Sequence, residues 1–300
     1  MSNCISPIVQ LTKTKVPCLA PCGQCMPCRV NQRRAKANRI LLEMKSHNHV
    51  AWLTLTYDED HVRIDDNGML TLCPQDMTNY LKRLRHYGLE FKYYYVGEYG
   101  SPEKTERPHY HAFLFGVDGS EPLLREQWPY GNVYVGANPK ASQIAEYTAS
   151  YVKKKLTKKK LRSEGDLRVP EFTRSSKNPA IGFNYAMQIA EKLAYAVQKI
   201  YKNSGNSITD EAIERLETGL SVCKHGQKSY PYDPWLKRKM VDRVRSICPY
   251  MFTKHVHEQK LRANFNAWAL LPKDEYKRYQ WEQFQKANLA RKQNAKKQKI

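Results

Sequence analysis

The order of hydrophobic and polar positions predicts a chain that mixes helices and strands. A helical repeat of apolar residues, with basic residues on the opposite side, runs through residues 29–45. A run of β-branched and aromatic residues at 50–57 then predicts a buried strand. A second helical repeat at 74–87 is ended by Gly88.

Two more strand-like runs, 91–99 and 109–115, are separated by a polar loop that contains glycine and proline. They predict an antiparallel hairpin with a long tip. A short strand at 131–136 and a helix at 141–155 follow. The expected order is therefore strand, helix, strand, strand, strand, helix, which is an α+β arrangement.

Beyond Lys155 the chain becomes highly charged and poor in apolar residues, so we place a domain boundary near residue 165. The rest is expected to be mostly helical. The candidate helices there are 179–201, 209–216, 233–244 and 274–297. We expect three parts: a Cys-rich segment with a basic helix at 1–48, a central domain at 49–165, and a helical basic region at 166–300.

The charge of the chain points to a polyanionic partner. Its 300 residues include 50 Lys+Arg and 29 Asp+Glu, for a formal net charge of +21 and a pI of about 9.6. Such an excess most often marks a nucleic-acid-binding protein, because Lys and Arg neutralise phosphates and release their counterions. With 41% hydrophobic residues the chain can build a core, which excludes wholesale disorder.

The hydropathy argues against a membrane protein. The mean hydropathy is −0.72 and no apolar run reaches 18 residues, so we expect no transmembrane helix. The first residues lack the apolar stretch of a signal peptide, and we expect the protein to act in the cytoplasm.

A cluster of cysteines near the start suggests a metal site. Four of the eight cysteines fall within eleven residues, at Cys18, Cys22, Cys25 and Cys28, whereas Cys4 and the remaining three are scattered. In a reducing cytosol such a cluster favours metal ligands over disulfides, and thiolates suit structural zinc or an iron–sulfur cluster. His47 or His49 could replace one thiol, and reduced thiols in a simple turn are the alternative.

The most informative string is His109-Tyr110-His111. In a strand, residues i and i+2 project from one face, so the two imidazoles lie side by side, while Tyr110 points to the opposite face and packs in the core. Hairpin pairing would bring Glu98 opposite the histidines. Two imidazoles and a carboxylate with open positions suit Mg²⁺ or Mn²⁺ acting on a phosphate. Two histidines that are simply hydrogen-bonded remain the alternative.

Tyr147 and Tyr151 are four residues apart on a predicted helix, so their phenols share one face. A tyrosine oxygen can attack a phosphodiester if a nearby group offsets the developing charge, and Lys154 lies close by in the same helix. Core packing of the two rings is the alternative explanation for this spacing.

Together these motifs resemble the HUH endonuclease superfamily, and within it the rolling-circle replication initiators of small single-stranded DNA phages of the microvirus type. The hydrophobic strand motif is similar to residues 52–57, the His-hydrophobe-His motif to 109–111, and the two-tyrosine helix to 147–154, in the family's order. The strings GEYG and PCGQCMPCR also resemble the phage subfamily, and the likeness covers about residues 18–160.

The resemblance implies a ferredoxin-like antiparallel sheet and a metal-dependent enzyme that nicks and joins single-stranded DNA at a viral origin in a bacterial host. A 5′-phosphotyrosine intermediate would leave a 3′-hydroxyl for a host polymerase, and the second tyrosine would act after one round. Because the chain has no GxxxxGK[ST] phosphate loop, unwinding would depend on a host helicase. A relaxase or transposase of the same chemistry is the near alternative. A non-catalytic zinc-containing nucleic-acid-binding protein is the alternative from another class.

One departure from the family concerns the nucleophiles. In the family each tyrosine tends to be followed three residues later by lysine. Tyr151 is followed by Lys154, but Tyr147 is followed by Ser150. Either a neighbouring lysine compensates or Tyr147 is the weaker nucleophile, so we rank Tyr151 above Tyr147.

Overall fold

The computed structural model describes residues 4–11, 17–100, 105–136 and 166–252, together with 274, 275 and 278. It divides into two compact units. One unit comprises Met1–Ala35, Ala190–Cys223 and Pro231–Ile300, and the other comprises Lys36–Ile189 and Lys224–Tyr230.

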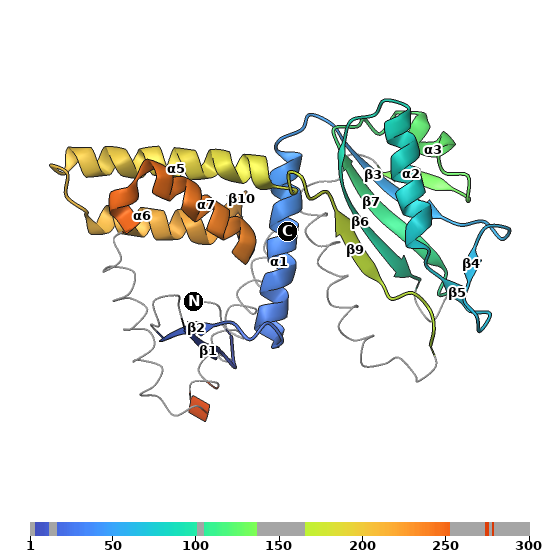
Figure 1. Ribbon diagram of the computed structural model, residues 1–300, viewed down its shortest axis with the longest axis horizontal. Helices are drawn as coiled ribbons and strands as arrows, with labels where there is room; N and C mark the ends of the chain where they lie inside the picture. The colour runs from blue at the N-terminus through green and yellow to red at the C-terminus, as the bar shows by residue number, and fades with distance from the viewer. Residues whose placement is uncertain are drawn as a thin grey trace, which may run out of the picture. The chain divides into compact units, whose positions relative to one another are not determined.

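The second unit is built on a five-stranded antiparallel sheet (Figure 1). Its strands are β3 (Val50–Thr56), β6 (Lys92–Tyr99), β7 (Pro108–Phe115), β8 (Val133–Gly136) and β9 (Phe172–Ser175). They lie in the order β8-β3-β7-β6-β9, and every neighbouring pair is antiparallel. The first four strands of this sheet thus take the spatial order 4-1-3-2, which is that of a ferredoxin-like sheet. The α+β fold class is confirmed.

One face of this sheet is covered by α2 (Pro74–His86) and α3 (Leu123–Glu126) (Figure 1). Alternate residues of the strands meet the helices here because successive side chains of a strand point to opposite faces. The main core lies in this layer, and its fully buried members include Leu53, Leu55, Tyr80, Leu84 and Tyr110.

The opposite face has an apolar half and a polar half. In the apolar half, Phe113, Phe115, Val96 and Tyr94 pack against Ile40 of α1 (Met26–Met44). Further along the same strands, the residues of this face are Thr54, Glu98, His109 and His111. The same period-2 alternation that buries one half of the face therefore presents a row of polar side chains on the other half.

Most predicted elements lie where the pattern placed them. The helices expected at 29–45 and 74–87 correspond to α1 and α2, and Gly88 ends α2 with a φ of 90°. The helix expected at 141–155 and nearly all of that at 274–297 lie outside the described residues. The described C-terminal helices are α5 (Phe183–Asn203), α6 (Asp210–Ser221), α7 (Pro234–Ile247) and the 3₁₀ helix η1 (Pro249–Phe252).

Several short strands were not expected from the pattern. They are β9 and three two-stranded hairpins: β1 (Ile8–Leu11) with β2 (Pro17–Ala20), β4 (Arg63–Ile64) with β5 (Leu70–Thr71), and β10 (Val222–His225) with β11 (Lys228–Pro231). The division at residues 48 and 165 stays a prediction, although the sheet takes its edge strand β9 from beyond residue 165. Among the helices that the structure describes, none has the length and apolar character needed to span a bilayer.

Candidate functional site

The polar end of the sheet brings Glu98, His109 and His111 together. The register pairs Glu98 of β6 with His109 of β7, and His111 follows two residues later on the same face. The imidazole ring centroids lie 4.9 Å apart. One ligand atom from each of the three residues lies within 4.8 Å of the others. The hairpin pairing expected from the sequence is confirmed by this register.

The two imidazoles point at the same carboxylate oxygen. Nε2 of His109 lies 2.9 Å and Nε2 of His111 lies 3.1 Å from Oε1 of Glu98. A carboxylate oxygen only accepts, so a proton or a cation must stand between each nitrogen and this oxygen. Burial alone raises the pKa of Glu98, but hydrogen bonds from both histidines lower it to about 2, so the carboxylate is charged.

The other imidazole nitrogens are held by groups outside the site. Nδ1 of His109 donates to the carbonyl oxygen of Arg107 at 3.0 Å, and Nδ1 of His111 lies 2.9 Å from Oγ1 of Thr54. These contacts place the Nδ1 protons outward and leave both Nε2 atoms for the centre, as in metal-ligating histidines.

The three side chains fit a divalent ion. The second oxygen of Glu98, Oε2, is buried and has no hydrogen-bond partner, so it could accept from a further ligand or bind an ion. Two imidazole nitrogens and a carboxylate leave several coordination positions open, which suits Mg²⁺ or Mn²⁺. The side chains of His109 and His111 are 18% and 12% exposed, so the site is open to a ligand on one side.

Tyr110 supports the two histidines from behind the sheet. Its side chain is fully buried, and its hydroxyl donates to the carbonyl oxygen of Cys73 at 2.7 Å and accepts from the Cys73 N–H at 2.8 Å. The placement of Tyr110 in the core, expected from the alternation, is confirmed. The opposite face of β7 is therefore tied to the start of α2, which fixes the strand that carries the histidines.

Thr54 was not singled out from the sequence, and its contact with His111 gives a testable prediction. Thr54→Val removes the acceptor for the Nδ1 proton and is expected to lower Mn²⁺ affinity at this site by about 10- to 100-fold. Thr54→Ser keeps the hydroxyl and should restore binding. Titration of free Mn²⁺ by electron paramagnetic resonance measures both. Equal affinity of Thr54→Val and the wild type would show that this contact does not position the ligand.

The predicted nucleophiles Tyr147 and Tyr151, and Lys154, lie outside the described residues. In the sequence they follow β8, which pairs with β3 in the register Thr54↔Tyr134. Their proximity to Glu98, His109 and His111 stays a prediction.

A second candidate metal site is a cluster of four thiols, and its membership differs from the expected one. The structure gathers Cys4, Cys22, Cys25 and Cys28, whose Sγ atoms all lie within 4.8 Å of one another. Cys4, which the sequence interpretation left among the scattered cysteines, joins the cluster. The backbone of Cys18 lies in β2 and pairs with Gln10, and its side chain lies outside the described residues.

The alternative histidine ligands have other partners. Nε2 of His47 lies 2.8 Å from Oε1 of Glu43, and Nδ1 of His49 lies 2.9 Å from Oδ2 of Asp118. Neither histidine belongs to the cysteine cluster. Although burial raises the pKa of the Cys22 thiol, the N–H groups of Cys25 and Gln24 lower it to about 6, so this sulfur is available as a thiolate.

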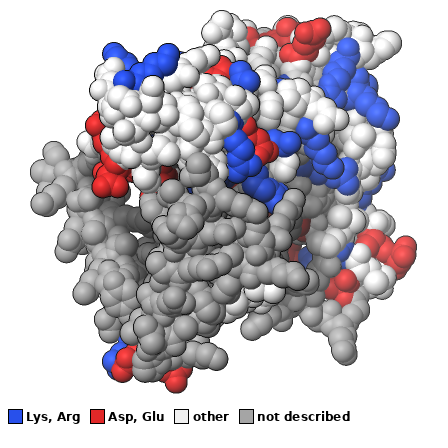
Figure 2. Space-filling model, turned by 60° about the vertical axis from the view of Figure 1, so that its left-hand side comes forward, with Lys and Arg blue, Asp and Glu red and all other residues white. Residues whose placement is uncertain are grey.

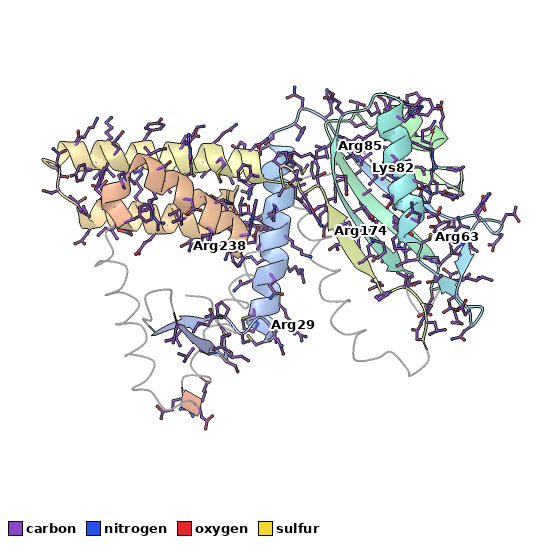
Figure 3. The ribbon with its side chains drawn as sticks, in the orientation of Figure 1. Arg29, Arg63, Lys82, Arg85, Arg174 and Arg238 are labelled. Atoms are coloured by element: carbon purple, nitrogen blue, oxygen red, sulfur yellow. The ribbon has the colours of Figure 1, made fainter. Side chains whose placement is uncertain are left out.

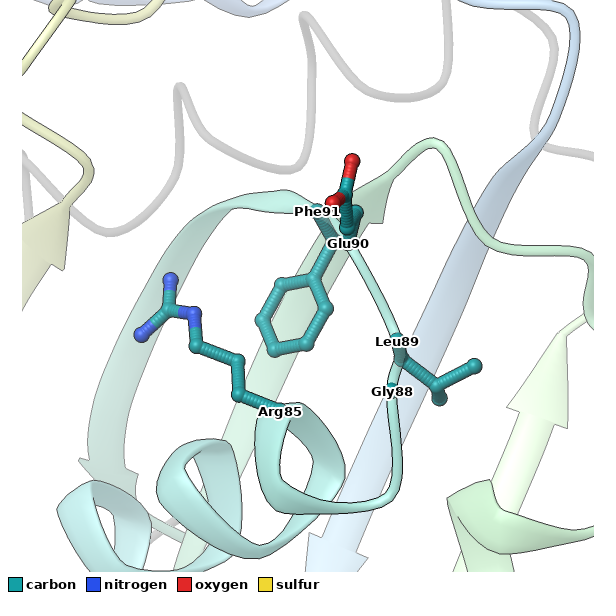
Figure 4. Close-up of a pocket in the computed structure, with 5 residues that line it drawn as sticks. All are labelled: Arg85, Gly88, Leu89, Glu90 and Phe91. Carbon is teal, nitrogen blue, oxygen red and sulfur yellow. The ribbon is translucent and has the colours of Figure 1, made fainter.

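Away from these sites, the edge of the sheet carries a hollow lined by basic and aromatic residues. It has a volume of about 790 Å³ and is lined by residues that include Arg85 of α2, Tyr93 and Arg174 of β9, two of them labelled in Figure 3. A smaller hollow beside it also contains Arg85, whose guanidinium lies 4.7 Å from the ring centre of Phe91 (Figure 4).

The surface charge is distributed rather than gathered in one patch. On the face shown in Figure 2, the Lys and Arg side chains of the described residues form several groups with acidic groups among them. The lysine-rich stretch 153–162 and the basic stretch 286–300 lie outside the described residues. The positive charge is thus spread over much of the chain, as suits contact with an extended polyanion.

Comparison with known proteins agrees with the resemblance. Residues 50–156 match the model of a family described as replication-associated protein ORF2. The chain is 33% identical over 162 residues to the replication-associated protein VP4 of Bdellovibrio phage phiMH2K, covering 45% of this chain and 48% of that protein. It is 32% identical over 220 residues to the replication-associated protein ORF2 of Spiroplasma virus 4, covering 66% and 64%.

A third relative, the replication-associated protein ORF4 of Chlamydia phage 1, is 32% identical over 161 residues, which is 45% of this chain and 38% of that protein. The chain thus covers less than two thirds of the length of each of these relatives. No solved structure matches the chain. These matches confirm the resemblance to replication-associated proteins of small single-stranded DNA phages.

Proposed function

We propose that this chain, which belongs through residues 50–156 to the family of replication-associated protein ORF2, initiates rolling-circle replication by nicking and rejoining single-stranded DNA. The observation that carries the proposal is the convergence of His109 and His111 on Glu98 at the open end of the sheet. Such a site has open positions for a phosphate, which a purely structural ion would not need.

Glu98, His109 and His111 would hold the ion. A bound Mg²⁺ or Mn²⁺ supplies Lewis-acid polarisation of a phosphate oxygen. The chain's own contribution is to fix the ligands: Thr54 and the Arg107 carbonyl hold the imidazoles, and Tyr110 anchors their strand to α2. This preorganisation means that few groups have to move when the DNA binds.

In the proposed reaction a tyrosine oxygen, from Tyr151 or Tyr147, attacks the phosphorus of the scissile phosphodiester. A bond forms between the tyrosine oxygen and phosphorus, and the bond from phosphorus to the 3′-oxygen breaks. The phenol loses its proton to water, and the departing 3′-oxygen gains one, so the net change is an exchange of esters that needs no energy source. Lys154 would offset the charge that develops near the nucleophile.

The exchange leaves a 5′-phosphotyrosine link and a free 3′-hydroxyl. A host polymerase would extend the 3′-hydroxyl while a host helicase unwinds the duplex inside the bacterial host cell. After one round, the second tyrosine would cleave the regenerated origin, and the released 3′-hydroxyl would attack the first phosphotyrosine and close a circle. Two tyrosines one helical turn apart would serve this alternation.

The test is the formation of a covalent protein–DNA adduct. Overlapping labelled single-stranded oligonucleotides that cover the genome encoding the chain are incubated with the full protein and Mn²⁺, and are then separated in SDS. We expect one SDS-resistant adduct that is restricted to oligonucleotides with one shared sequence. Its loss with EDTA and return with added Mn²⁺ would support metal dependence.

The same experiment distinguishes the alternatives. A non-catalytic nucleic-acid-binding protein would shift the oligonucleotides in a native gel but would form no SDS-resistant adduct with any of them. Adduct formation at full rate in EDTA would contradict the metal dependence, while leaving the nicking activity in place.

The basic and aromatic hollow at the sheet edge supports a second contact with single-stranded DNA. Arg85 lies over the rings of Phe91 and Tyr93, and Arg174 lies over the ring of Phe172, so the surface combines cations with aromatic platforms. Replacing both arginines with alanine is expected to reduce the slope of log affinity against log salt by about 1.4 for single-stranded DNA.

The matched control is Arg85→Lys/Arg174→Lys, which keeps both charges and should keep the salt slope. Fluorescence anisotropy at several salt concentrations measures it. An unchanged slope in the double alanine variant would show that DNA does not contact this hollow.

A further inference from the structure

We infer that Cys4, Cys22, Cys25 and Cys28 bind one zinc ion, with Cys4 in place of Cys18 as the fourth ligand. The site is separate from the proposed nicking centre, and it does not depend on the nicking function. It would serve to hold the N-terminal β1–β2 hairpin against the start of α1.

The spacing of the sulfur atoms fits a single tetrahedral ion. Sγ of Cys25 lies 3.8 Å from Sγ of Cys4, and Sγ of Cys22 lies 4.0 Å from Sγ of Cys28. A tetrahedron with Zn–S bonds of about 2.3 Å has S···S edges of about 3.8 Å. A disulfide would need about 2.05 Å, and the four cysteines are free thiols. A cluster of several irons would hold its cysteine sulfurs farther apart than one ion does.

The backbone around the thiols is arranged as in thiolate metal sites. The N–H of Cys25 donates to Sγ of Cys22, and the N–H of Cys22 donates to Sγ of Cys4, each at 3.3 Å. Gly23 has a φ of 75°, which lets the chain turn between Cys22 and Cys25, and Gln32 of α1 donates to its carbonyl oxygen at 3.0 Å. The sulfur atoms therefore receive hydrogen bonds that favour their charged form.

Two ligands are buried and belong to separate elements. Cys4 and Cys28 are 2% and 3% exposed. Cys28 lies in the first turn of α1, where the free N–H groups and the helix dipole favour a thiolate. With all four positions filled by protein sulfur, a bound zinc has no open position, so the site is structural rather than catalytic.

The segment between Cys4 and Cys22 shows why the ion would be needed. It contains the β1–β2 hairpin, and all four residues of β1 are exposed, with Ile8, Val9 and Leu11 each at least 46% exposed. A two-stranded hairpin without a packed face is marginal in water. An ion bonded to Cys4 before β1 and to Cys22 after β2 closes the hairpin at its base, so zinc binding and folding of this segment would be coupled.

The test compares two cysteine variants of the full chain by metal analysis. Cys4→Ser is expected to lower bound zinc from about one equivalent to near zero, and Cys18→Ser should retain about one equivalent. Loss of zinc in Cys18→Ser with retention in Cys4→Ser would overturn the ligand set. Absence of zinc from the wild type after purification with added zinc would overturn the site.

A second measurement covers the case in which a variant fails to fold. Co²⁺ replaces zinc in the wild-type chain, and its absorption spectrum reports the number of thiolates. We expect the intense visible bands and sulfur-to-metal charge transfer of a four-thiolate tetrahedral site. A spectrum of an octahedral or a mixed oxygen and nitrogen site would contradict it. Neither readout depends on nicking, so failure here leaves the proposed function untouched, and the reverse also holds.

Discussion

Replacing His109 or His111 with alanine is expected to lower the rate of covalent adduct formation by about 100-fold or more. Each imidazole aims its Nε2 at the oxygen shared with Glu98, so the loss of one leaves at most two protein ligands for the ion. Lewis-acid stabilisation of the transition state is worth several kcal/mol, and about 1.36 kcal/mol corresponds to a tenfold change in rate. Single-turnover measurement of the adduct with Mn²⁺ gives the rate.

The matched control for these variants is His49→Ala. His49 is 59% exposed and contacts Asp118, away from the proposed ligands. Its removal should leave the rate unchanged. A rate for His109→Ala and His111→Ala within a factor of about three of that of His49→Ala would contradict the proposed metal site, provided that circular dichroism shows all three variants folded.

The second large effect concerns the nucleophiles. Tyr147→Phe/Tyr151→Phe should form no SDS-resistant adduct, because phenylalanine keeps the ring but has no oxygen to attack phosphorus. Binding of single-stranded DNA should persist, since the change removes no charge. Among the single variants, Tyr151→Phe should lose more of the first cleavage than Tyr147→Phe, because Lys154 follows Tyr151 at the family spacing.

The control for the tyrosines is Tyr134→Phe. Tyr134 is 68% exposed on β8 and pairs with Thr54, so it is an accessible hydroxyl on the sheet that carries the proposed metal site. We expect this variant to form the adduct at the wild-type rate. If Tyr134→Phe abolished the adduct and the double variant kept it, the nucleophile would have been assigned to the wrong tyrosines.

The Glu98, His109 and His111 arrangement was predictable because it depends on local rules. Side chains two apart share a strand face, and one hairpin pairs neighbouring strands, so a sequence pattern is enough to bring Glu98 opposite His109. Thr54 could not be identified in this way. Its contact with His111 depends on pairing between β3 and β7, which are distant in the sequence, and the register of such a pair is set by the whole sheet.

The cysteine cluster shows the same limit. Cys22, Cys25 and Cys28 are linked by a tight turn and the first turn of α1, so their spacing alone predicted them. Cys4 comes from 18 positions before Cys22, carried by a hairpin whose first strand is exposed throughout and has no apolar alternation to reveal it. Only the folded arrangement shows that Cys4 is near the other three.

The edge strand β9 was also missed for a physical reason. Phe172–Ser175 is four residues long and mostly polar, and it forms a strand because β6 offers it backbone hydrogen-bonding partners from Tyr94 to Gly97. Strand formation that depends on a distant partner is weakly encoded in the local sequence.

The most direct test of the central claim is to find the amino acid that carries the DNA. The adduct formed with Mn²⁺ is digested with nuclease and protease, and the peptides are sequenced by mass spectrometry. We predict one nucleotide joined through its 5′-phosphate to Tyr151 or Tyr147, absent when His111→Ala is used. A nucleotide attached to any other residue, or an adduct that forms equally well in His111→Ala, would contradict the account.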